Sequence, residues 1–174
     1  IKNTENFIFS KAPSRARRIA KQNDTIISTV RTYLKAIDFI DELKFNYIFS
    51  TGFAVLEPHF DIVPKYLNFI VKSNFFTNQV EVNSKGMSYP AINSTDLGNL
   101  ITLIPKIEEQ TKIASFLDEK TTKIDEVISQ KEKLIELLKE RKQIVINEAI
   151  TKGLDKTVEF KESGVEWIGT IPKH

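Results

Sequence analysis

Residues 107–150 constrain the fold more than any other stretch, because they contain neither glycine nor proline and are dominated by Glu, Lys, Ile and Leu. Apolar residues recur there in two rows, each with a period of seven and offset by four. This pattern predicts a coiled-coil helix. The helix-pairing seam consists of Leu117, Ile124, Ile128, Ile135, Leu138 and Val145. Lys131 and Lys142 interrupt the rows, and we expect them to fix register or to extend outward.

A helix of this length would measure about 66 Å at ~1.5 Å per residue. One small domain cannot bury an apolar stripe that long. The stripe therefore needs another long helix, either running antiparallel or supplied by a second copy of the chain. Gly153 follows the last periodic residues and is a suitable C-cap for the helix.

The residues before this helix carry the pattern of a small α+β unit. Three runs within residues 25–56 are rich in Ile, Val, Thr and aromatic residues and predict strands. Pro64 is a suitable first residue for a helix over 64–76. Residues 82–99 collect Asn, Ser, Gly and Pro and are expected to form a loop, followed by a short strand at 99–105. The predicted fold is α+β, with a small mixed sheet followed by the long helix.

Composition excludes several kinds of site. The 174 residues include no cysteine, which rules out disulfide scaffolds and cysteine-based metal sites. The histidines are His59 and His174 only, and no glycine-rich phosphate-binding motif is present. No apolar run approaches the ~20 residues needed to span a bilayer. We expect a cytoplasmic protein without catalytic or metal-binding residues.

One fragment resembles a metal-dependent nuclease site. Asp155 is followed by the triplet Glu159-Phe160-Lys161, an acid and a Glu-x-Lys sequence. The two acids are only four residues apart, and the tail offers no predicted strand pair to hold them. We therefore expect no nuclease activity.

Positive charge is concentrated near the beginning of the chain. Residues 11–35 hold seven basic residues and a single acid, Asp24. Such a patch is typical of a polyanion-binding surface, although most runs of charge are solvated surface loops. Two loops carry side chains suited to reading nucleic acid, since Arg forks onto guanine and polar groups reach base edges or phosphates. The candidates are Arg15, Arg17 and Arg18 in 11–21, and Lys85, Ser88 and Tyr89 in 83–94.

From Pro105 onward the sequence resembles a known family. The segment "IPKIEEQTKIASFLDEKTTKIDEVISQ" is similar to the "PP-x-x-EQ-x-x-I-x-x-x-LD" entry to the long helix of type I restriction–modification DNA-specificity subunits. Glu109-Gln110, Ile113 and Leu117-Asp118 match, while Ile104-Pro105 replaces the double proline. Upstream, "PSRARRIAKQNDTIISTVR", "STGFAVL" and "KGMSYPAINSTDLGNL" resemble the second half of a target-recognition domain.

The resemblance implies a DNA-reading subunit without a catalytic centre. Subunits of this family carry two target-recognition domains, each reading half of a split DNA sequence, separated by two antiparallel helices. Methyltransferase subunits bind the subunit, and restriction subunits join to cut; S-adenosylmethionine, ATP and Mg are expected only on those partners. Arg31, in "STVR", matches a family position and joins the candidates as a phosphate contact or a structural ion pair.

The resemblance also divides the chain. Residues 1–105 correspond to a target-recognition domain that lacks its beginning, 106–150 to the spacer helix, and 151–174 to the start of a following domain. That last segment contains Trp167, which we expect to pack on the domain it begins, on its own domain or on a second copy. The alternative function is a coiled-coil dimerisation fragment without DNA binding of its own.

Overall fold

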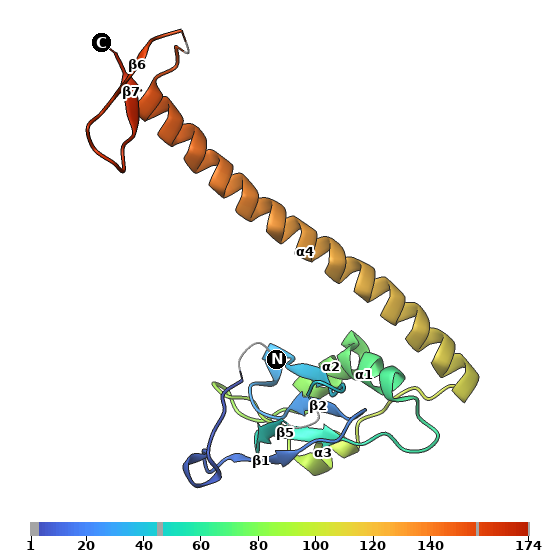
Figure 1. The fold of residues 1–174 in the computed structure, drawn as a ribbon. Helices are drawn as coiled ribbons and strands as arrows, with labels where there is room; N and C mark the ends of the chain where they lie inside the picture. The colour runs from blue at the N-terminus through green and yellow to red at the C-terminus, as the bar shows by residue number, and fades with distance from the viewer. Residues whose placement is uncertain (1–3, 45–46, 156, 174) are drawn as a thin grey trace. The chain divides into compact units, whose positions relative to one another are not determined.

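A computed structural model describes residues 4–44, 47–155 and 157–173. The chain divides into two units, and the boundary falls inside the long helix α4, between Glu119 and Lys120. The strands of the first unit are β1 (Ala16–Ile19), β2 (Thr25–Ser28), β3 (Ile37–Phe39), β4 (Ile48–Ser50) and β5 (Phe53–Leu56). Its helices are the 3-10 turns η1 (Phe9–Lys11) and η2 (Thr32–Leu34), then α1 (Pro64–Lys72), α2 (Asn74–Val82), α3 (Ser94–Gly98) and the first turns of α4 (Ile107–Lys152). Figure 1 shows their arrangement.

Strand β2 is the centre of the first unit. It pairs with β3 on one side and β5 on the other, while β1 and β4 form a separate two-stranded sheet. Every residue of β2 is buried. All strand pairings among the described residues are antiparallel, so the α+β class is confirmed and the predicted mixed sheet is corrected. The strands expected within residues 25–56 are present.

The hydrophobic core lies on both faces of β2, because successive side chains of a strand point to opposite faces. Ile27 packs with apolar side chains of α1, α2 and α3, including Val71, Phe76 and Leu97. Ile26 packs on the other face with Ala20, Ile40 and Phe49. Burial on both sides explains why this strand is a continuous run of Thr, Ile and Ser rather than an alternating one.

Three local expectations need correction. The helix predicted over 64–76 breaks at Ser73, whose extended backbone ends α1 and whose hydroxyl accepts a hydrogen bond from the Phe76 N–H at 3.3 Å as the N-cap of α2. The predicted loop 82–99 contains helix α3, capped by Asn93. The predicted loop 11–21 contains strand β1.

The segment 99–105 was predicted to be a strand from its composition, but it forms none. Side chains occupy its backbone groups instead. The Gln79 amide accepts a hydrogen bond from Ile101 N at 3.1 Å and donates one to Ile101 O at 2.9 Å. The Tyr66 hydroxyl donates to Leu103 O at 2.8 Å. The Gln79 amide thus makes the two hydrogen bonds that a neighbouring strand would make with Ile101, so no strand pairs there.

Gln110 ties the start of α4 to the first unit. Its side chain is 1% exposed. Its Oε1 accepts a hydrogen bond from Val63 N at 2.9 Å, and its Nε2 donates to Asp61 O at 3.0 Å and to Pro105 O at 2.8 Å. Ala114, one turn further along the helix, is also buried. The first turns of α4 thus present one face to the unit, at the spacing of a helix.

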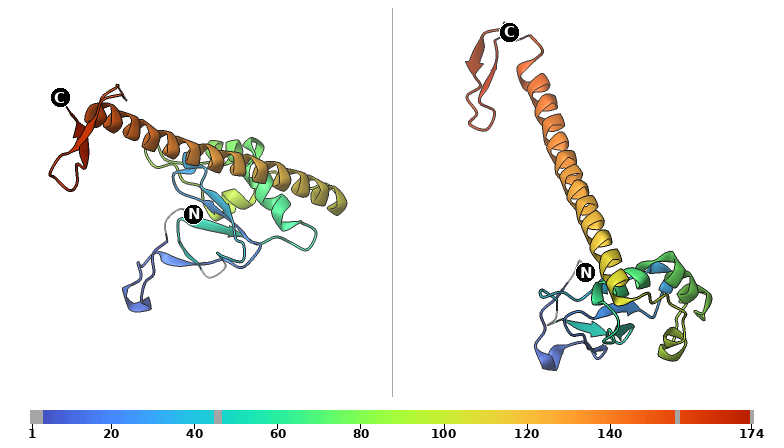
Figure 2. Two further views of the ribbon diagram at one scale, coloured as in Figure 1. Left: turned by 45° about the horizontal axis from the view of Figure 1, so that its top comes forward. Right: turned by 90° about the vertical axis from the view of Figure 1, so that its right-hand side faces the viewer.

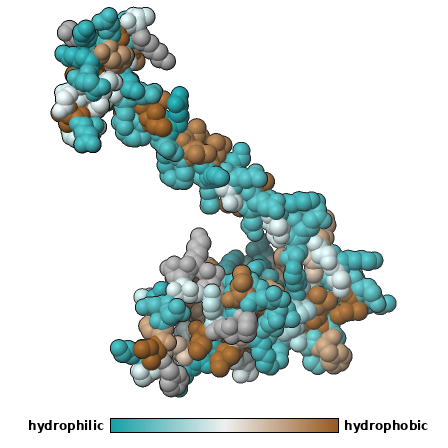
Figure 3. Space-filling view, in the orientation of Figure 1, coloured by the Kyte–Doolittle hydropathy of each residue, from teal (hydrophilic) through white to brown (hydrophobic). Residues whose placement is uncertain are grey.

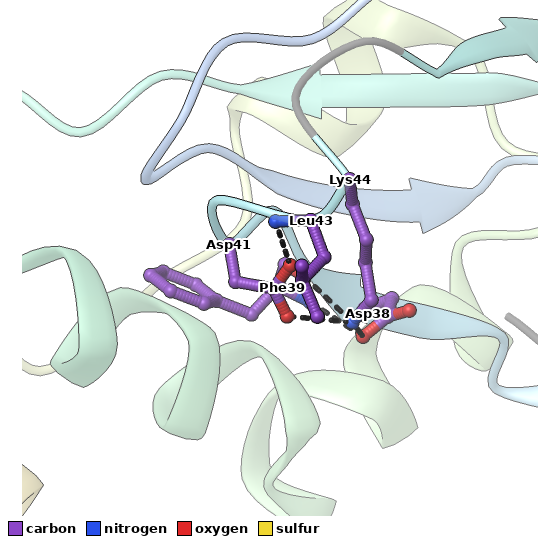
Figure 4. A network of polar contacts seen from close by, with 5 residues as sticks. All are labelled: Asp38, Phe39, Asp41, Leu43 and Lys44. Atoms are coloured by element: carbon purple, nitrogen blue, oxygen red, sulfur yellow. Dashed lines mark hydrogen bonds and ion pairs between the residues drawn. The ribbon is translucent and has the colours of Figure 1, made fainter.

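A polar cluster closes the turn after β3 (Figure 4). The Lys44 ammonium lies 3.2 Å from carboxylate oxygens of both Asp38 and Asp41 and donates to Phe39 O at 3.3 Å. Burial lowers the pKa of Lys44, but hydrogen bonds to Asp41 and Asp38 outweigh burial, so the pKa is raised above its ordinary value. Leu43 N donates to Asp41 at 3.0 Å, which fixes the turn.

The second unit consists of the remainder of α4 and a hairpin. Gly153, with φ +72°, follows the last helical residue and confirms the predicted C-cap. The seam residues from Ile124 to Val145 are about half exposed, from 48% to 58%. Figure 3 shows apolar side chains gathered in patches along α4.

Strands β6 (Phe160–Glu162) and β7 (Thr170–Pro172) pair antiparallel in the hairpin (Figure 2). Gly164 and Gly169 both have positive φ in the connecting turn. Trp167 lies in this turn with 86% of its surface exposed. Among the described residues, no helix is long and apolar enough to cross a membrane.

We expect Gln110→Glu to destabilise the protein by about 2–4 kcal/mol at neutral pH. The variant keeps an oxygen for Val63 N but places a second oxygen, without hydrogens, against the carbonyls of Asp61 and Pro105. Urea unfolding measures the loss, which should diminish as the pH falls from neutral toward about 4, because the buried glutamic acid gains a proton more readily than the unfolded one and can then donate again. Gln143→Glu on the exposed part of α4 is the matched control. Equal stability of both variants would contradict this role for Gln110.

We also expect Asp24 to make stability fall as the pH rises. Asp24 is 3% exposed and accepts a hydrogen bond from Lys21 N at 2.7 Å. Burial raises its pKa, and this outweighs the lowering by the Lys21 N–H. The folded chain therefore binds a proton more readily than the unfolded chain, so stability is lost between the ordinary aspartate pKa, about 4, and the higher folded value.

Asp24→Asn keeps an acceptor for Lys21 N and removes this charge. The free energy of unfolding of the variant, minus that of the unmodified protein, should therefore increase from about pH 4 upward and then level off. Urea titrations across this range measure the difference, with Asp125→Asn on the exposed surface of α4 as control. A difference that does not change with pH would refute the assignment.

Candidate nucleic-acid interface

Arg15, Arg17 and Arg18 are exposed at the first turn and strand of the unit. Arg15 lies in the turn before β1, and its carbonyl accepts a hydrogen bond from Thr51 N at 2.8 Å. Arg17 and Arg18 lie in β1 itself, where a register shift between Ala16 and Arg18 marks an irregularity. Arg17 Nε donates to Ser14 O at 2.8 Å. A bulge of this kind increases the local twist and re-aims the side chains.

Arg31 and Tyr89 are brought together, although they are far apart in the sequence. The Arg31 guanidinium lies 4.8 Å from the centre of the Tyr89 ring, within cation–π range. Arg31 has φ +52°, a left-handed conformation at the start of η2. Thr32, the next residue, binds the loop with its N–H to Pro90 O at 3.4 Å and its hydroxyl at 2.8 Å from Ser84 Oγ.

Lys85, Ser88 and Tyr89 belong to a loop closed by its own backbone. Lys85 N donates to Ala91 O at 2.8 Å, and Ala91 N donates to Lys85 O at 2.9 Å. Gly86 has φ +109°, and a Cβ there would lie 3.1 Å from Tyr89 O, so the turn requires glycine. Ser88 is exposed, and the Lys85 ammonium, 3.6 Å from Asp96, is 83% exposed.

A chain of backbone hydrogen bonds connects the two groups of candidates. Thr51, next to Gly52, donates to Arg15 O, and Gly52 O accepts from both Thr29 N at 2.8 Å and Thr29 Oγ1 at 3.0 Å. Thr29 O in turn accepts from Ile92 N at 2.9 Å, beyond the closed loop. In the described part of the chain, no hydrogen bond or ion pair joins the side chains of the arginines in 15–18 to those of Arg31, Lys85, Ser88 or Tyr89.

The charge on these residues is available to an external anion. Within the ranges that the structure describes, Arg15, Arg17, Arg18 and Arg31 form no ion pair. Guanidinium groups carry five N–H donors in a plane, which suits phosphate oxygens and base edges. The arrangement therefore offers positive charge, fixed donors and one stacked aromatic ring.

Sequence reasoning missed two features of this surface. The Thr29–Gly52 connection is invisible in the sequence, because the Thr29 N–H and hydroxyl both donate to a backbone carbonyl 23 residues away. Met87 was not singled out, yet its side chain is fully exposed, at 101%, between Gly86 and Ser88. The sequence did hold a signal for this exposure, because a long apolar residue inside a polar, glycine-containing loop has no predicted core to pack against.

The nuclease-like fragment also differs from expectation. The tail does contain a strand pair, because β6 pairs with β7. Glu159 nevertheless forms an ion pair with Lys173 at 3.2 Å. Among the described residues, no group of three His, Asp or Glu side chains is placed to hold a metal ion.

Comparisons with known proteins agree on one family. The model of the type I restriction modification DNA specificity domain matches residues 8–137. The specificity subunit of the type I restriction enzyme HindI from Haemophilus influenzae is 31% identical over 127 residues, which is 68% of this chain and 28% of that protein. This chain therefore spans under a third of that relative.

Two solved structures are similar in fold. The crystal structure of the HsdS subunit from Thermoanaerobacter tengcongensis has a TM-score of 0.60 and 29% identity, over 90% of this chain and 38% of that one. A structure solved for complex assembly and conformational transition of the type I R-M system has a TM-score of 0.62 with the same identity and coverage. With the family model covering most of its length, the chain belongs to the family of type I restriction modification DNA specificity domains.

Proposed function

We propose that this chain recognises double-stranded DNA in a type I restriction–modification complex and directs methyltransferase and restriction subunits to one half of a split target. The observation that carries the proposal is the position of the family match. Residues 8–137 include all seven candidate contact residues and the helix entry held by Gln110. Unpaired guanidinium groups on one unit support DNA as the ligand, because neutralised phosphates dominate affinity in such interfaces.

The parts of the chain have separate roles in this proposal. Residues 1–105 act as a target-recognition domain, 106–150 as the spacer helix, and 151–174 as the start of a following domain. The start of α4 at Ile107 supports the first boundary, and the end of the helix before Gly153 supports the second. The chain itself contributes recognition and scaffolding, whereas methylation and cleavage belong to cytoplasmic partner subunits that carry S-adenosylmethionine, ATP and Mg.

The seam on α4 is the proposed helix-pairing surface. Leu117, half-buried in the first unit, is the first seam residue, and the exposed Ile124, Ile128, Ile135, Leu138 and Val145 follow it along the helix. Burying such a row against a second long helix removes apolar surface from water at about 25 cal/mol per Å². The partner helix runs antiparallel, in the same subunit or in a second copy.

Mapping of DNA methylation tests the proposal. The native protein containing this chain is co-expressed with the methyltransferase subunit of its system in a host without adenine methylation, and the complex is purified. We expect co-purification and methylation at a recurring motif split by a fixed spacer. Methylation without a recurring motif, or no association between the subunits, would refute the proposed function.

Replacing Arg15, Arg17 and Arg18 together by Ala should weaken binding of this complex to its mapped DNA target. If each arginine neutralises one phosphate, the slope of log affinity against log salt should become shallower by up to about 2.7, from ~0.9 per phosphate. Fluorescence anisotropy between about 50 and 200 mM salt measures this slope. The matched control replaces Lys72, Lys133 and Lys161, which removes the same charge elsewhere. Identical effects of both triple variants would mean that only net charge matters.

The alternative function is dimerisation through α4 without DNA binding. The exposed seam is the observation in its favour. Analytical ultracentrifugation and DNA titration of the same sample separate the two. A dimer that leaves duplex DNA unbound would favour the alternative, whereas salt-dependent DNA binding lost in the arginine variant would favour recognition.

A further inference from the structure

The loop Gly86–Pro90 projects from a frame made by backbone atoms. The paired hydrogen bonds between Lys85 and Ala91 close its base, at 2.8 and 2.9 Å. Beyond the base, Ile92 N donates to Thr29 O, and Pro90 O accepts from Thr32 N. The loop is therefore narrow at its base and fixed to the end of β2, which is buried on both faces. A narrow, fixed projection is a shape that a DNA groove admits.

The loop combines positive charge with one exposed apolar side chain. Lys85 at the base and Arg31 over the Tyr89 ring supply positive charge. Met87 lies between Lys85 and Tyr89 in sequence and exposes its whole side chain. A single exposed methionine is ordinary on a protein surface. This exposed methionine, however, belongs to a closed loop that also carries Lys85 and the tyrosine stacked against Arg31, and this positive charge attracts a polyanion.

Phosphate contacts position a protein on DNA, whereas contacts with base edges specify the sequence. In the major groove the base edges offer hydrogen-bond donors, acceptors and one apolar group, the C5 methyl of thymine. A thioether donates no hydrogen bond and accepts only weakly. Among the base edges, a methionine side chain therefore favours the thymine methyl.

We propose that Met87 reads an A·T pair through the thymine methyl group, with Lys85 and Arg31 contacting flanking phosphates. This assignment rests on the proposed DNA-recognition function and adds to it a specificity-determining residue. It makes Met87 a determinant of sequence choice, in contrast to Arg15, Arg17 and Arg18, whose proposed contacts set affinity.

The test uses the purified complex with its methyltransferase subunit and the DNA motif mapped for the unmodified protein. Each thymine of the motif is replaced in turn by deoxyuridine, which pairs with adenine but lacks the methyl group. We expect one replacement to weaken binding of the unmodified complex about three- to tenfold, the effect of leaving one methyl unburied. The Met87→Ala complex should bind both duplexes equally and should methylate a motif relaxed at that single position.

Leu43→Ala is the matched control, since Leu43 is also an exposed aliphatic residue, at 84%, and lies outside the loop. It should leave the motif and the deoxyuridine effect unchanged. A motif without thymine, or no thymine whose replacement distinguishes the two complexes, would overturn the assignment. So would a uniform loss of affinity for Met87→Ala on every duplex, which would indicate a wedge between base pairs. If the unmodified complex recognises no recurring motif, the proposed function itself fails as well.

Discussion

The buried amide of Gln110 is the interaction on which the geometry of the helix entry depends. One side chain satisfies the backbone at three points, Val63, Asp61 and Pro105, and Ala114 is buried one turn further along the helix. The arrangement needs an acceptor and two donors on one planar group of the right length. Glutamate lacks the donors, and asparagine is one methylene shorter. The Glu-Gln pair in the entry motif thus has a structural explanation in its second residue.

The candidate interface depends on the core through β2. Because this strand is buried on both faces, packing from two sides fixes its position. The segments that follow it are fixed in turn, since the chain and its hydrogen bonds connect them to the strand. Thr29, directly after β2, binds Gly52 on one side and Ile92 on the other. One threonine therefore links the turn next to Arg15 with the loop that carries Tyr89. The candidate side chains themselves are exposed, whereas β2, which fixes the position of these segments, is buried.

Periodicity and local chemistry predicted much of the fold. The long helix, its end at Gly153, the strands within 25–56 and the helix start at Pro64 all followed from patterns within single segments. The predictions that were wrong concern features that depend on residues far away in the sequence. The segment 99–105 has strand composition, but Gln79 occupies its backbone groups; β1 is too charged to read as a strand, but pairs with β4. The contact of Arg31 with Tyr89 likewise has no signature in sequence spacing.

The frame of the loop Gly86–Pro90 has a consequence for how such a protein can change over generations. Its closing bonds join backbone atoms of Lys85 and Ala91, so they survive almost any exchange of side chains between them. Gly86 is the exception, because its conformation and the nearby Tyr89 carbonyl exclude a larger residue. The exposed residues Met87 and Ser88 can therefore vary with little effect on folding stability, whereas exchange of Tyr89 also removes its contact with Arg31. Substitutions at the exposed positions of this loop therefore leave the backbone hydrogen bonds that close it intact.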